Sequence, residues 1–362
     1  MTLKTLLVIG GSGAMGQHVI QSLLESPNTF GQIRILTRDP SSNECRALEK
    51  LGSGKVVFNK GNVNDEASLR AAFAGVHSIF CNTNFWSCLQ DIWTENGKVE
   101  TDPWPSYRLA EELDVQQGKL ILKLARELGV EHFVFSSLDA MDEPSGGLFP
   151  APHFDAKARV AKFIGEQGQI DAWYAEHVTV LVTAPYMENF KAGRMFRGGG
   201  TRAAVRLEGA REKPRLVLRV PIGSALWPMV TLDDIGWFAA HILDHEELWR
   251  GRTLRIVSES LSLNEIGRIF QSVTGIEAVV DPYTLQEYRA INLPETPALS
   301  NMFGFIDRFG LPHDMNMLRG LNPSLITFEK WLRMSGWKGE QGIVQKENAR
   351  PLSRSDEPVL KN

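Results

Sequence analysis

Short apolar runs bounded by turn residues alternate with segments of helical period through the first half of the chain. The runs are nearly continuously apolar, as expected of strands that are buried on both faces of a parallel sheet. The helical segments between them repeat their apolar residues every three or four positions. This alternation predicts an α/β fold with a doubly wound parallel sheet of six strands. The predicted strands are Leu3–Ile9, Ile33–Thr37, Lys55–Asn59, Ser78–Cys81, His132–Ser136 and Val178–Val182, and the predicted helices include Met15–Glu25, Ser68–Phe73, Gln117–Leu128 and Ala156–Glu166.

The second half of the chain has a different pattern. It predicts a smaller lobe of mixed helix and strand over residues 191–338, interleaved with the doubly wound domain of residues 1–190. Residues 339–362 are polar and charged and contain two prolines, which predicts a disordered tail. The elements predicted in the second lobe are helices at Val230–Leu243, Leu263–Thr274, near Thr284–Ile291 and at Ser324–Met334, and a strand at Thr253–Val257.

Charge and cysteine content exclude several classes of protein. With 43% hydrophobic residues the chain can build a substantial core, and its net charge of −4 argues against a globally basic nucleic-acid binder. No apolar run approaches the roughly 20 residues that would span a membrane. Cys45, Cys81 and Cys88 have the spacing of neither a disulfide framework nor a zinc site. We therefore expect no metal and a cytoplasmic location, with the nucleus as a further compartment.

One local charge excess changes this picture. Residues 191–219 carry nine Lys or Arg and two Glu, a local net charge of +7. Such a segment could attract an acidic partner protein, or it could be a solvated loop. No aromatic interleaving or recognition motif accompanies it, so we do not expect nucleic acid as the partner.

A glycine-rich segment follows the first predicted strand and opens the first predicted helix. It reads Gly10-Gly11-Ser12-Gly13-Ala14-Met15-Gly16. The first glycine permits a tight turn, Gly13 lets the backbone approach a phosphate, and Gly16 allows the helix to pack closely on the strand. The N-terminus of the helix then offers free N–H groups to an anion. The pattern predicts a dinucleotide-binding site, and its glycines fit two spacings, so it does not distinguish between dinucleotide-binding subclasses.

The residue at the end of the second predicted strand favours one dinucleotide over another. An NAD enzyme would place an acidic residue there, to bind the ribose hydroxyls. This chain has Arg38, which can hold a 2′-phosphate with two charge-assisted hydrogen bonds. Arg38 could also be a solvated residue at the end of a strand. We favour NADP(H) as the cofactor.

With these motifs in view, the sequence resembles the NmrA-like family of atypical short-chain dehydrogenase/reductases. The resemblance runs from Leu3 to about Trp337 and rests on several motifs in one order. Besides the glycine segment, these are Leu36-Thr37-Arg38-Asp39-Pro40, Asn82-Thr83-Asn84-Phe85-Trp86, His153-Phe154-Asp155-Ala156-Lys157 and Pro185-Tyr186-Met187-Glu188-Asn189-Phe190, with Asn301-Met302-Phe303 and Leu321-Asn322-Pro323 later in the chain.

The resemblance implies a set of cofactor-binding residues. Lys157 would reach the nicotinamide ribose, and Pro185–Phe190 would close over the nicotinamide end of the cofactor. Where this chain has Gly61-Asn62, family members usually have Gly-Asp, so a contact on the adenine side could be altered. The residues implied to hold NADP(H) are Gly10, Gly11, Ser12, Gly13, Met15, Gly16, Arg38, Asn62, Asn82, Thr83, Asn84, Ser136, Lys157, Tyr186 and Asn189, with Ser137 beside them.

Aromatic residues suggest a substrate pocket. Around residues 91–113 the chain looks longer than the family's redox sensor, and the surplus includes Trp93, Trp104 and Tyr107. These rings could form the floor of a pocket for a flat substrate, or they could pack locally. Trp86 and Phe190 are further candidates for substrate contact.

The catalytic motif of ordinary short-chain dehydrogenases is altered. Their Tyr-x-x-x-Lys stands here as His153-x-x-x-Lys157, a change that the family shares. His153 could donate the proton, although we expect the ammonium group of Lys157 to favour its neutral form unless Asp155 offsets that effect. It could equally fix a loop or contact the ribose.

Two functions of different class follow. The first is an NADPH-dependent oxidoreductase acting on a small carbonyl or conjugated substrate, with an aromatic one as a candidate. The second is a redox sensor with little or no turnover, in which NADPH occupancy changes shape or assembly and so the affinity for a protein partner, with a homodimer as a candidate assembly. The substrate and the direction of hydride transfer stay open.

Overall fold

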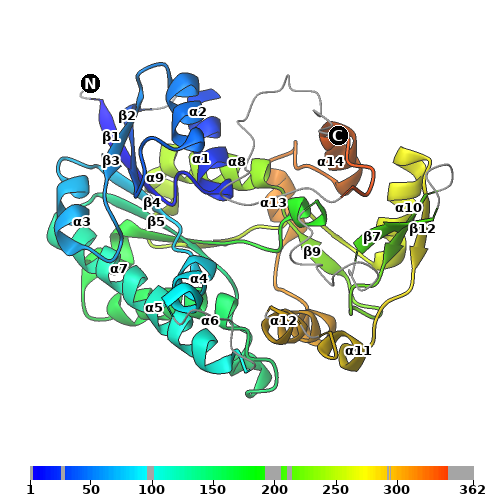
Figure 1. Ribbon diagram of the computed structural model, residues 1–362. Helices are drawn as coiled ribbons and strands as arrows, with labels where there is room; N and C mark the ends of the chain where they lie inside the picture. Colours follow the sequence, from blue (N-terminus) through cyan, green and yellow to red (C-terminus); the bar gives the residue numbers. More distant parts are fainter. Residues whose placement is uncertain are drawn as a thin grey trace.

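The computed structural model describes residues 3–25, 29–95, 102–191, 205–209, 214–291, 293 and 295–340. Its main feature is a parallel sheet of seven strands in the order β10-β6-β5-β4-β1-β2-β3 (Figure 1). The strands are β1 (Lys4–Ile9), β2 (Phe30–Thr37), β3 (Val56–Lys60), β4 (Ser78–Cys81), β5 (His132–Ser137), β6 (Val178–Val182) and β10 (Thr253–Arg255).

The sheet confirms the predicted fold class and adds one strand to it. All six predicted strands are present, with bounds that differ by at most three residues. The sequence pattern predicts the seventh, β10, as a strand of the second lobe, but it pairs in parallel with β6 and extends the main sheet. Strand order reverses at β1, which lies between β4 and β2. In open parallel sheets, ligands bind at the carboxyl ends of the strands beside such a reversal.

Alternate residues of β1 divide the core into two layers. Leu6 and Val8 belong to one buried cluster, whereas Leu7 and Ile9 belong to another on the opposite face of the sheet. The first layer is covered by α1 (Ala14–Glu25) and α8 (Leu232–Asp244), with α2 (Asn43–Gly52) and α9 (Glu246–Trp249) nearby (Figure 1). The second layer is covered by α3 (Glu66–Phe73), α5 (Trp104–Glu127), α6 (Pro152–Gln167) and α7 (Ala172–His177). The chain therefore forms a three-layer α/β sandwich.

The aromatic surplus near residues 91–113 is mostly helical. It forms the end of α4 (Phe85–Glu95) and the first turns of α5, and residues 96–101 between them lie outside the described part. The predicted helix Gln117–Leu128 is therefore only the second half of the 24-residue α5. Proline is tolerated in a first helical turn, where its missing N–H group has no partner in any case, and Pro105 stands there.

Beside the main sheet, the described residues of the second half form two small sheets and the five helices α10 to α14. The three-stranded sheet is mixed, because β8 pairs antiparallel with β7 and parallel with β12. Residues 341–362, which include nearly all of the predicted tail, lie outside the described residues. The elements here are β7 (Val205–Glu208), β8 (Arg215–Leu218), β9 (Trp227–Met229), β11 (Glu259–Leu261), β12 (Glu277–Val280), α10 (Leu263–Thr274), α11 (Leu285–Arg289), α12 (Thr296–Phe309), α13 (Met315–Leu321) and α14 (Phe328–Ser335).

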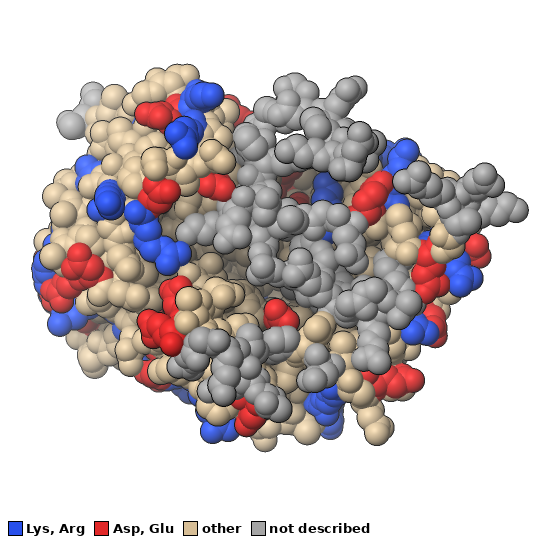
Figure 2. Space-filling model, in the orientation of Figure 1, with Lys and Arg blue, Asp and Glu red and all other residues tan. Residues whose placement is uncertain are grey.

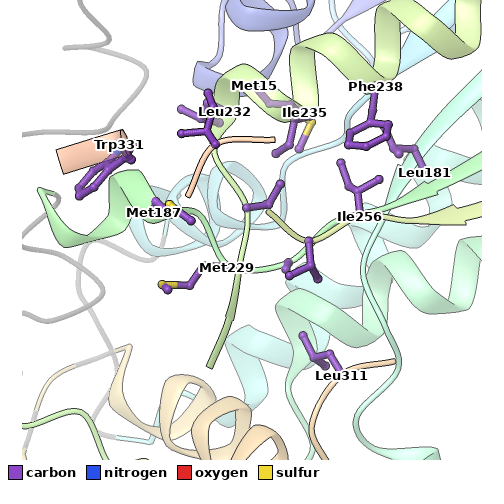
Figure 3. Close-up of a cluster of buried hydrophobic side chains, with 14 of the residues drawn as sticks. Met15, Leu181, Met187, Met229, Leu232, Ile235, Phe238, Ile256, Leu311 and Trp331 are labelled. Atoms are coloured by element: carbon purple, nitrogen blue, oxygen red, sulfur yellow. The ribbon is translucent and has the colours of Figure 1, made fainter. Parts of the chain in front are cut away.

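One apolar cluster joins the two halves. Figure 3 shows Met15 of α1 and Leu181 of β6 beside Leu232 and Phe238 of α8, with Trp331 of α14 at the far side. Two elements after residue 190, α8 and β10, lie on the main sheet. The predicted boundary between two domains at residue 190 therefore stays a prediction. In the described ranges, every helix is too short or too polar to cross a lipid bilayer.

The packing of α8 on α1 gives a testable prediction. A Cβ atom at Gly236 would lie 2.5 Å from the carbonyl oxygen of His18 in α1, so Gly236→Ala must push the helices apart. We expect a loss of about 1–3 kcal/mol in the free energy of unfolding, measured with urea. Gly165→Ala in α6 is the matched control, because nothing lies within 4 Å of the place that its Cβ would take and alanine favours helix by about 0.5–1 kcal/mol. Equal stability of the two variants would contradict this account of the packing.

Candidate functional site

A cleft opens at the carboxyl ends of β1, β2, β3 and β4, beside the reversal of strand order. Eight of the residues implied by the family resemblance meet there. They are Gly10, Ser12, Gly13, Arg38, Asn62, Asn82, Thr83 and Asn84. The cleft is also lined by residues that the sequence motifs do not predict as cofactor ligands, namely Asn64, Ser87, Cys88, Asp91 and Gln117.

The glycine segment brings α1 very close to the strands. Gly10 has a φ of 81°, and a Cβ there would lie 2.6 Å from the carbonyl oxygen of Asn82. A Cβ at Gly16 would lie 2.3 Å from the carbonyl oxygen of Gly10. Gly11 has another role, because its Cβ would meet the side chain of Ile35 at 2.9 Å, within the core rather than the cleft. The N-terminus of α1 thus stands directly beside the cleft, where it favours a bound anion.

Arg38 extends over the cleft from the end of β2 toward α4. Its side chain is 53% exposed, and Nη1 lies 3.8 Å from Oδ2 of Asp91. Nη2 donates to Oγ of Ser87 at 3.4 Å. The guanidinium group is therefore accessible to a ligand, and a carboxylate of this chain already lies beside it.

Asn62 is held by local hydrogen bonds before α3. Its Oδ1 accepts from the backbone N–H of Asn64 at 3.0 Å, and its own N–H donates to Oγ of Ser68 at 3.0 Å. The side-chain amide thus holds this turn without adding a negative charge to the cleft.

Lys157 is buried on α6, and its ammonium group faces α5 and β4. Nζ donates to both carboxylate oxygens of Asp114, at 3.0 Å and 2.8 Å, and to Oγ1 of Thr83. The side chain of Asp114 is fully buried, and that of Lys157 is 7% exposed. Asp114 belongs to none of the sequence motifs. A signal existed, because the buried positions of α5 recur at helical spacing and Asp114 occupies one of them.

His153 is enclosed by aromatic rings at the start of α6. The ring centroids of Trp86 and Phe154 lie 5.1 Å and 5.0 Å from that of the imidazole. Both ring nitrogens are buried, and neither has a hydrogen-bond partner among the described residues. Burial lowers the pKa of His153 to about 3. The imidazole is therefore neutral at physiological pH.

This finding corrects the expected cause of neutrality. The sequence predicts that the charge of Lys157 acts on His153, with Asp155 able to offset it, but burial is the cause. The ammonium group of Lys157 faces Asp114 instead. The carboxylate of Asp155 accepts the backbone N–H groups of Met141, Asp142 and Ala151 at 2.7–3.0 Å.

Other residues implied by the resemblance lie outside the lining of the cleft. Met15 and Ser136 are buried, and Oγ of Ser136 donates to Sδ of Met15 at 3.2 Å. Tyr186 precedes the 3₁₀ turn Met187–Phe190, in which the N–H of Asn189 donates to the carbonyl oxygen of Tyr186 at 3.1 Å. These residues do not line the cleft formed by the described chain.

The 3₁₀ turn Met187–Phe190 is fastened at several points. Oε2 of Glu188 accepts the N–H of Leu232 at 3.2 Å, and Oε1 accepts Nε1–H of Trp331 at 3.1 Å. Burial raises the pKa of Glu188 to about 7. Phe190 is 4% exposed and packs in the core, against the rings of Trp227, Phe328, Trp331 and Trp337.

The candidate substrate residues separate into two groups. Phe190, as just described, lies in the core. Trp93 and Trp104 pack with Tyr107 in a cluster between α4 and α5. Of the two roles considered for these rings, they therefore have local packing rather than the floor of a pocket. Trp86 is 38% exposed and lies beside His153. Of the four aromatic candidates, Trp86 is therefore the exposed one near the altered catalytic motif.

Only part of the basic segment 191–219 belongs to the described residues. Arg215 pairs with Glu208 at 3.1 Å, and Arg219 pairs with Asp281. Residues 192–204 and 210–213 lie outside the described part. On the face shown in Figure 2, positive and negative side chains are interspersed over the described residues. Within the described ranges, no three His, Cys, Asp or Glu side chains gather to hold a metal ion.

Comparisons with known proteins agree with this arrangement. The model of the NmrA-like family matches residues 2–337. The NmrA-like family domain-containing oxidoreductase hkm9 of Aspergillus hancockii is 26% identical over 317 residues, which cover 85% of this chain and 84% of that protein.

Two solved structures share the fold. The Citrobacter sp. triphenylmethane reductase complexed with NADP(H) has a TM-score of 0.63 at 18% identity, with 91% of this chain and 99% of that chain covered. NmrA, a negative transcriptional regulator, in complex with NADP has a TM-score of 0.67 at 14% identity, with 92% and 95% covered.

The burial of His153 predicts a loss of stability in acid. The folded-state pKa of about 3 lies below the ordinary value near 6.5. Between these two pH values, His153 binds a proton in the unfolded chain but not in the folded chain. Stability present above pH 6.5 is therefore lost as the pH falls, by about 2 kcal/mol at pH 5 from this one group. We expect His153→Phe, which suits the aromatic surroundings, to remove that share.

The measurement is urea unfolding at pH 7 and pH 5 for both proteins. His132, whose pKa burial also lowers to about 3, is present in both and cancels in the difference. Parallel losses of stability in the wild type and the variant would contradict a buried neutral imidazole at position 153.

Proposed function

Because this chain belongs to the NmrA-like family, whose model matches residues 2–337, we propose that it is an NADPH-dependent oxidoreductase acting on a small conjugated or carbonyl substrate. The observation that carries the proposal is Arg38, which extends over the glycine-lined cleft at the end of β2. An always-charged guanidinium at this place matches the 2′-phosphate of NADPH in charge and geometry.

The residues of the cleft fit this cofactor. The close backbone contacts that Gly10 and Gly16 allow keep the N-terminus of α1 beside the cleft, where its N–H groups could bind a pyrophosphate. Asn62, Asn82 and Asn84 offer amide groups to the sugar and base. The bound dinucleotide would supply the hydride, while the protein binds, orients and shields the reacting groups.

The state of His153 bears on the class of substrate. When hydride reaches a simple ketone, negative charge develops on oxygen and a proton donor is required. A neutral imidazole is a poor proton donor. A cationic or extended conjugated acceptor instead neutralises or spreads the incoming charge. We therefore propose such acceptors in preference to simple ketones, with Trp86 as the exposed aromatic side chain that contacts them.

The same observation favours a second function. A cleft that binds NADPH near a buried, neutral imidazole, which is a poor proton donor, is also suited to a redox sensor that binds the cofactor without turnover. The structural likeness to NmrA, a transcriptional regulator, supports this alternative.

A turnover assay separates the two functions. The purified protein is incubated with NADPH and with triarylmethane dye cations, quinones, enones and aromatic ketones, and the absorbance of NADPH is followed. We expect the first three classes to be reduced at least about ten times faster than the ketones. If no substrate leads to consumption of NADPH, and the oligomer size differs between NADP and NADPH, the oxidoreductase is refuted and the redox sensor is supported.

Cofactor preference gives a prediction for Arg38 and its neighbour Asp91. Arg38→Ala should weaken NADPH binding by about tenfold, which is modest because solvent screens the half-exposed guanidinium. The same variant should leave NADH binding within about twofold of the wild type. Asp91→Asn removes the carboxylate near the guanidinium and should strengthen NADPH binding by about two- to threefold. Both are measured by fluorescence titration. An equal loss of NADH and NADPH affinity in Arg38→Ala would refute a 2′-phosphate contact.

A further inference from the structure

The ammonium group of Lys157 has three N–H donors, and the structure accounts for all of them. Two reach the oxygens of Asp114 and the third reaches Oγ1 of Thr83. Lys157 is the hydrogen-bond partner that the described residues provide for the carboxylate of Asp114, whose side chain is fully buried. The pair is neutral overall and cannot separate without leaving an uncompensated buried charge.

This arrangement determines the direction of the Thr83 hydroxyl. Because Oγ1 accepts from a cation, its own hydrogen must point away from the ammonium group. The described part of the chain offers no acceptor for that hydrogen within bonding distance, although Thr83 is 5% exposed. Thr83 lines the cleft together with Gly10 and Asn82. Thr83, whose hydroxyl hydrogen is left without an acceptor among the described residues, therefore borders the place where the dinucleotide would lie.

We propose that Asp114 is a positioning residue, which holds Lys157 against Thr83 so that the Thr83 hydroxyl donates to an oxygen atom of the bound dinucleotide. This inference rests on the proposed NADPH-binding function. In it Thr83 contacts the cofactor, whereas Lys157 acts through Thr83 and does not reach the ribose directly. The role implied for Lys157 by the family resemblance is thereby transferred to a neighbouring side chain.

The surroundings keep this donor in one state. Besides Asp114 on α5, the titratable groups near Lys157 are the thiols of Cys81 on β4 and Cys88 on α4. Burial raises the pKa of Cys81 to about 12 and that of Cys88 to about 11. Both thiols are therefore neutral at physiological pH, and the Asp114–Lys157 pair is the charge that acts on Thr83 from within the described core.

The test compares NADPH dissociation constants, measured by fluorescence titration of the full chain. Thr83→Val, which removes the hydroxyl and keeps the shape, should weaken NADPH binding by about five- to tenfold, and Thr83→Ser should stay within about twofold. Asp114→Leu combined with Lys157→Met keeps the site neutral and frees the hydroxyl to rotate. With threonine kept at position 83, this paired variant should weaken NADPH binding by about three- to fivefold.

A triple variant completes the cycle. If Asp114 and Lys157 act through Thr83, adding the paired replacement to Thr83→Val should change the dissociation constant by less than about twofold. A further loss of about fivefold or more would show that the pair contacts the dinucleotide itself and would overturn the proposal. Thr179→Val, a buried replacement at the amino end of β6, is the control for general effects of losing a hydroxyl, and its affinity should match the wild type.

The outcomes distinguish this inference from the proposed function. If the wild type does not bind NADPH, the proposed function fails. If the wild type binds but Thr83→Val binds equally well, only the role of the hydroxyl fails. Should the paired variant not fold, the comparison of Thr83→Val with Thr83→Ser still decides, because the proposal requires them to differ.

Discussion

The close approach of α1 to the strand ends is the constraint on which the rest of the structure depends. Gly16 lies so near the turn at Gly10 that any side chain there would overlap backbone atoms. This contact sets the position of α1, and α8 packs on α1 through another glycine, Gly236. The second half of the chain returns to the sheet through α8. Positions without side chains thus locate both the cleft and the lobe beside it.

Two cations near the cleft have different surroundings and therefore different chemistry. Arg38 is half exposed, and its contacts with Asp91 at 3.8 Å and Ser87 at 3.4 Å are long, so a phosphate can displace them. Lys157 is buried and fully paired, so its charge is not available to a ligand in the same way. The exposed guanidinium of Arg38 can therefore contact a ligand, whereas the ammonium group of Lys157 orders the interior of the protein.

Much of the fold could be predicted because it depends on local patterns. The six strands are apolar runs, and the glycine segment and Arg38 are motifs of adjacent residues. The strand β10 is predicted as part of the second lobe and not of the main sheet, since its residues carry no information about a partner strand some 70 positions away. Asp114 and Asp91 escape prediction for the same reason, because each meets its partner only after helices have packed on the sheet. The protonation state of His153 follows from enclosure by rings, a tertiary effect that sequence spacing does not reveal.

The fastening of the turn Met187–Phe190 has a consequence for how ligands enter. The family resemblance implies that this segment closes over the nicotinamide, which suggests a flap. Moving it would break two hydrogen bonds to Glu188 and withdraw Phe190 from four aromatic neighbours, at a cost of several kcal/mol. The segment is thus a fixed part of the fold rather than a flap that opens and closes. If the cleft holds a dinucleotide as proposed, the ligand would enter where Arg38 and α4 border the cleft.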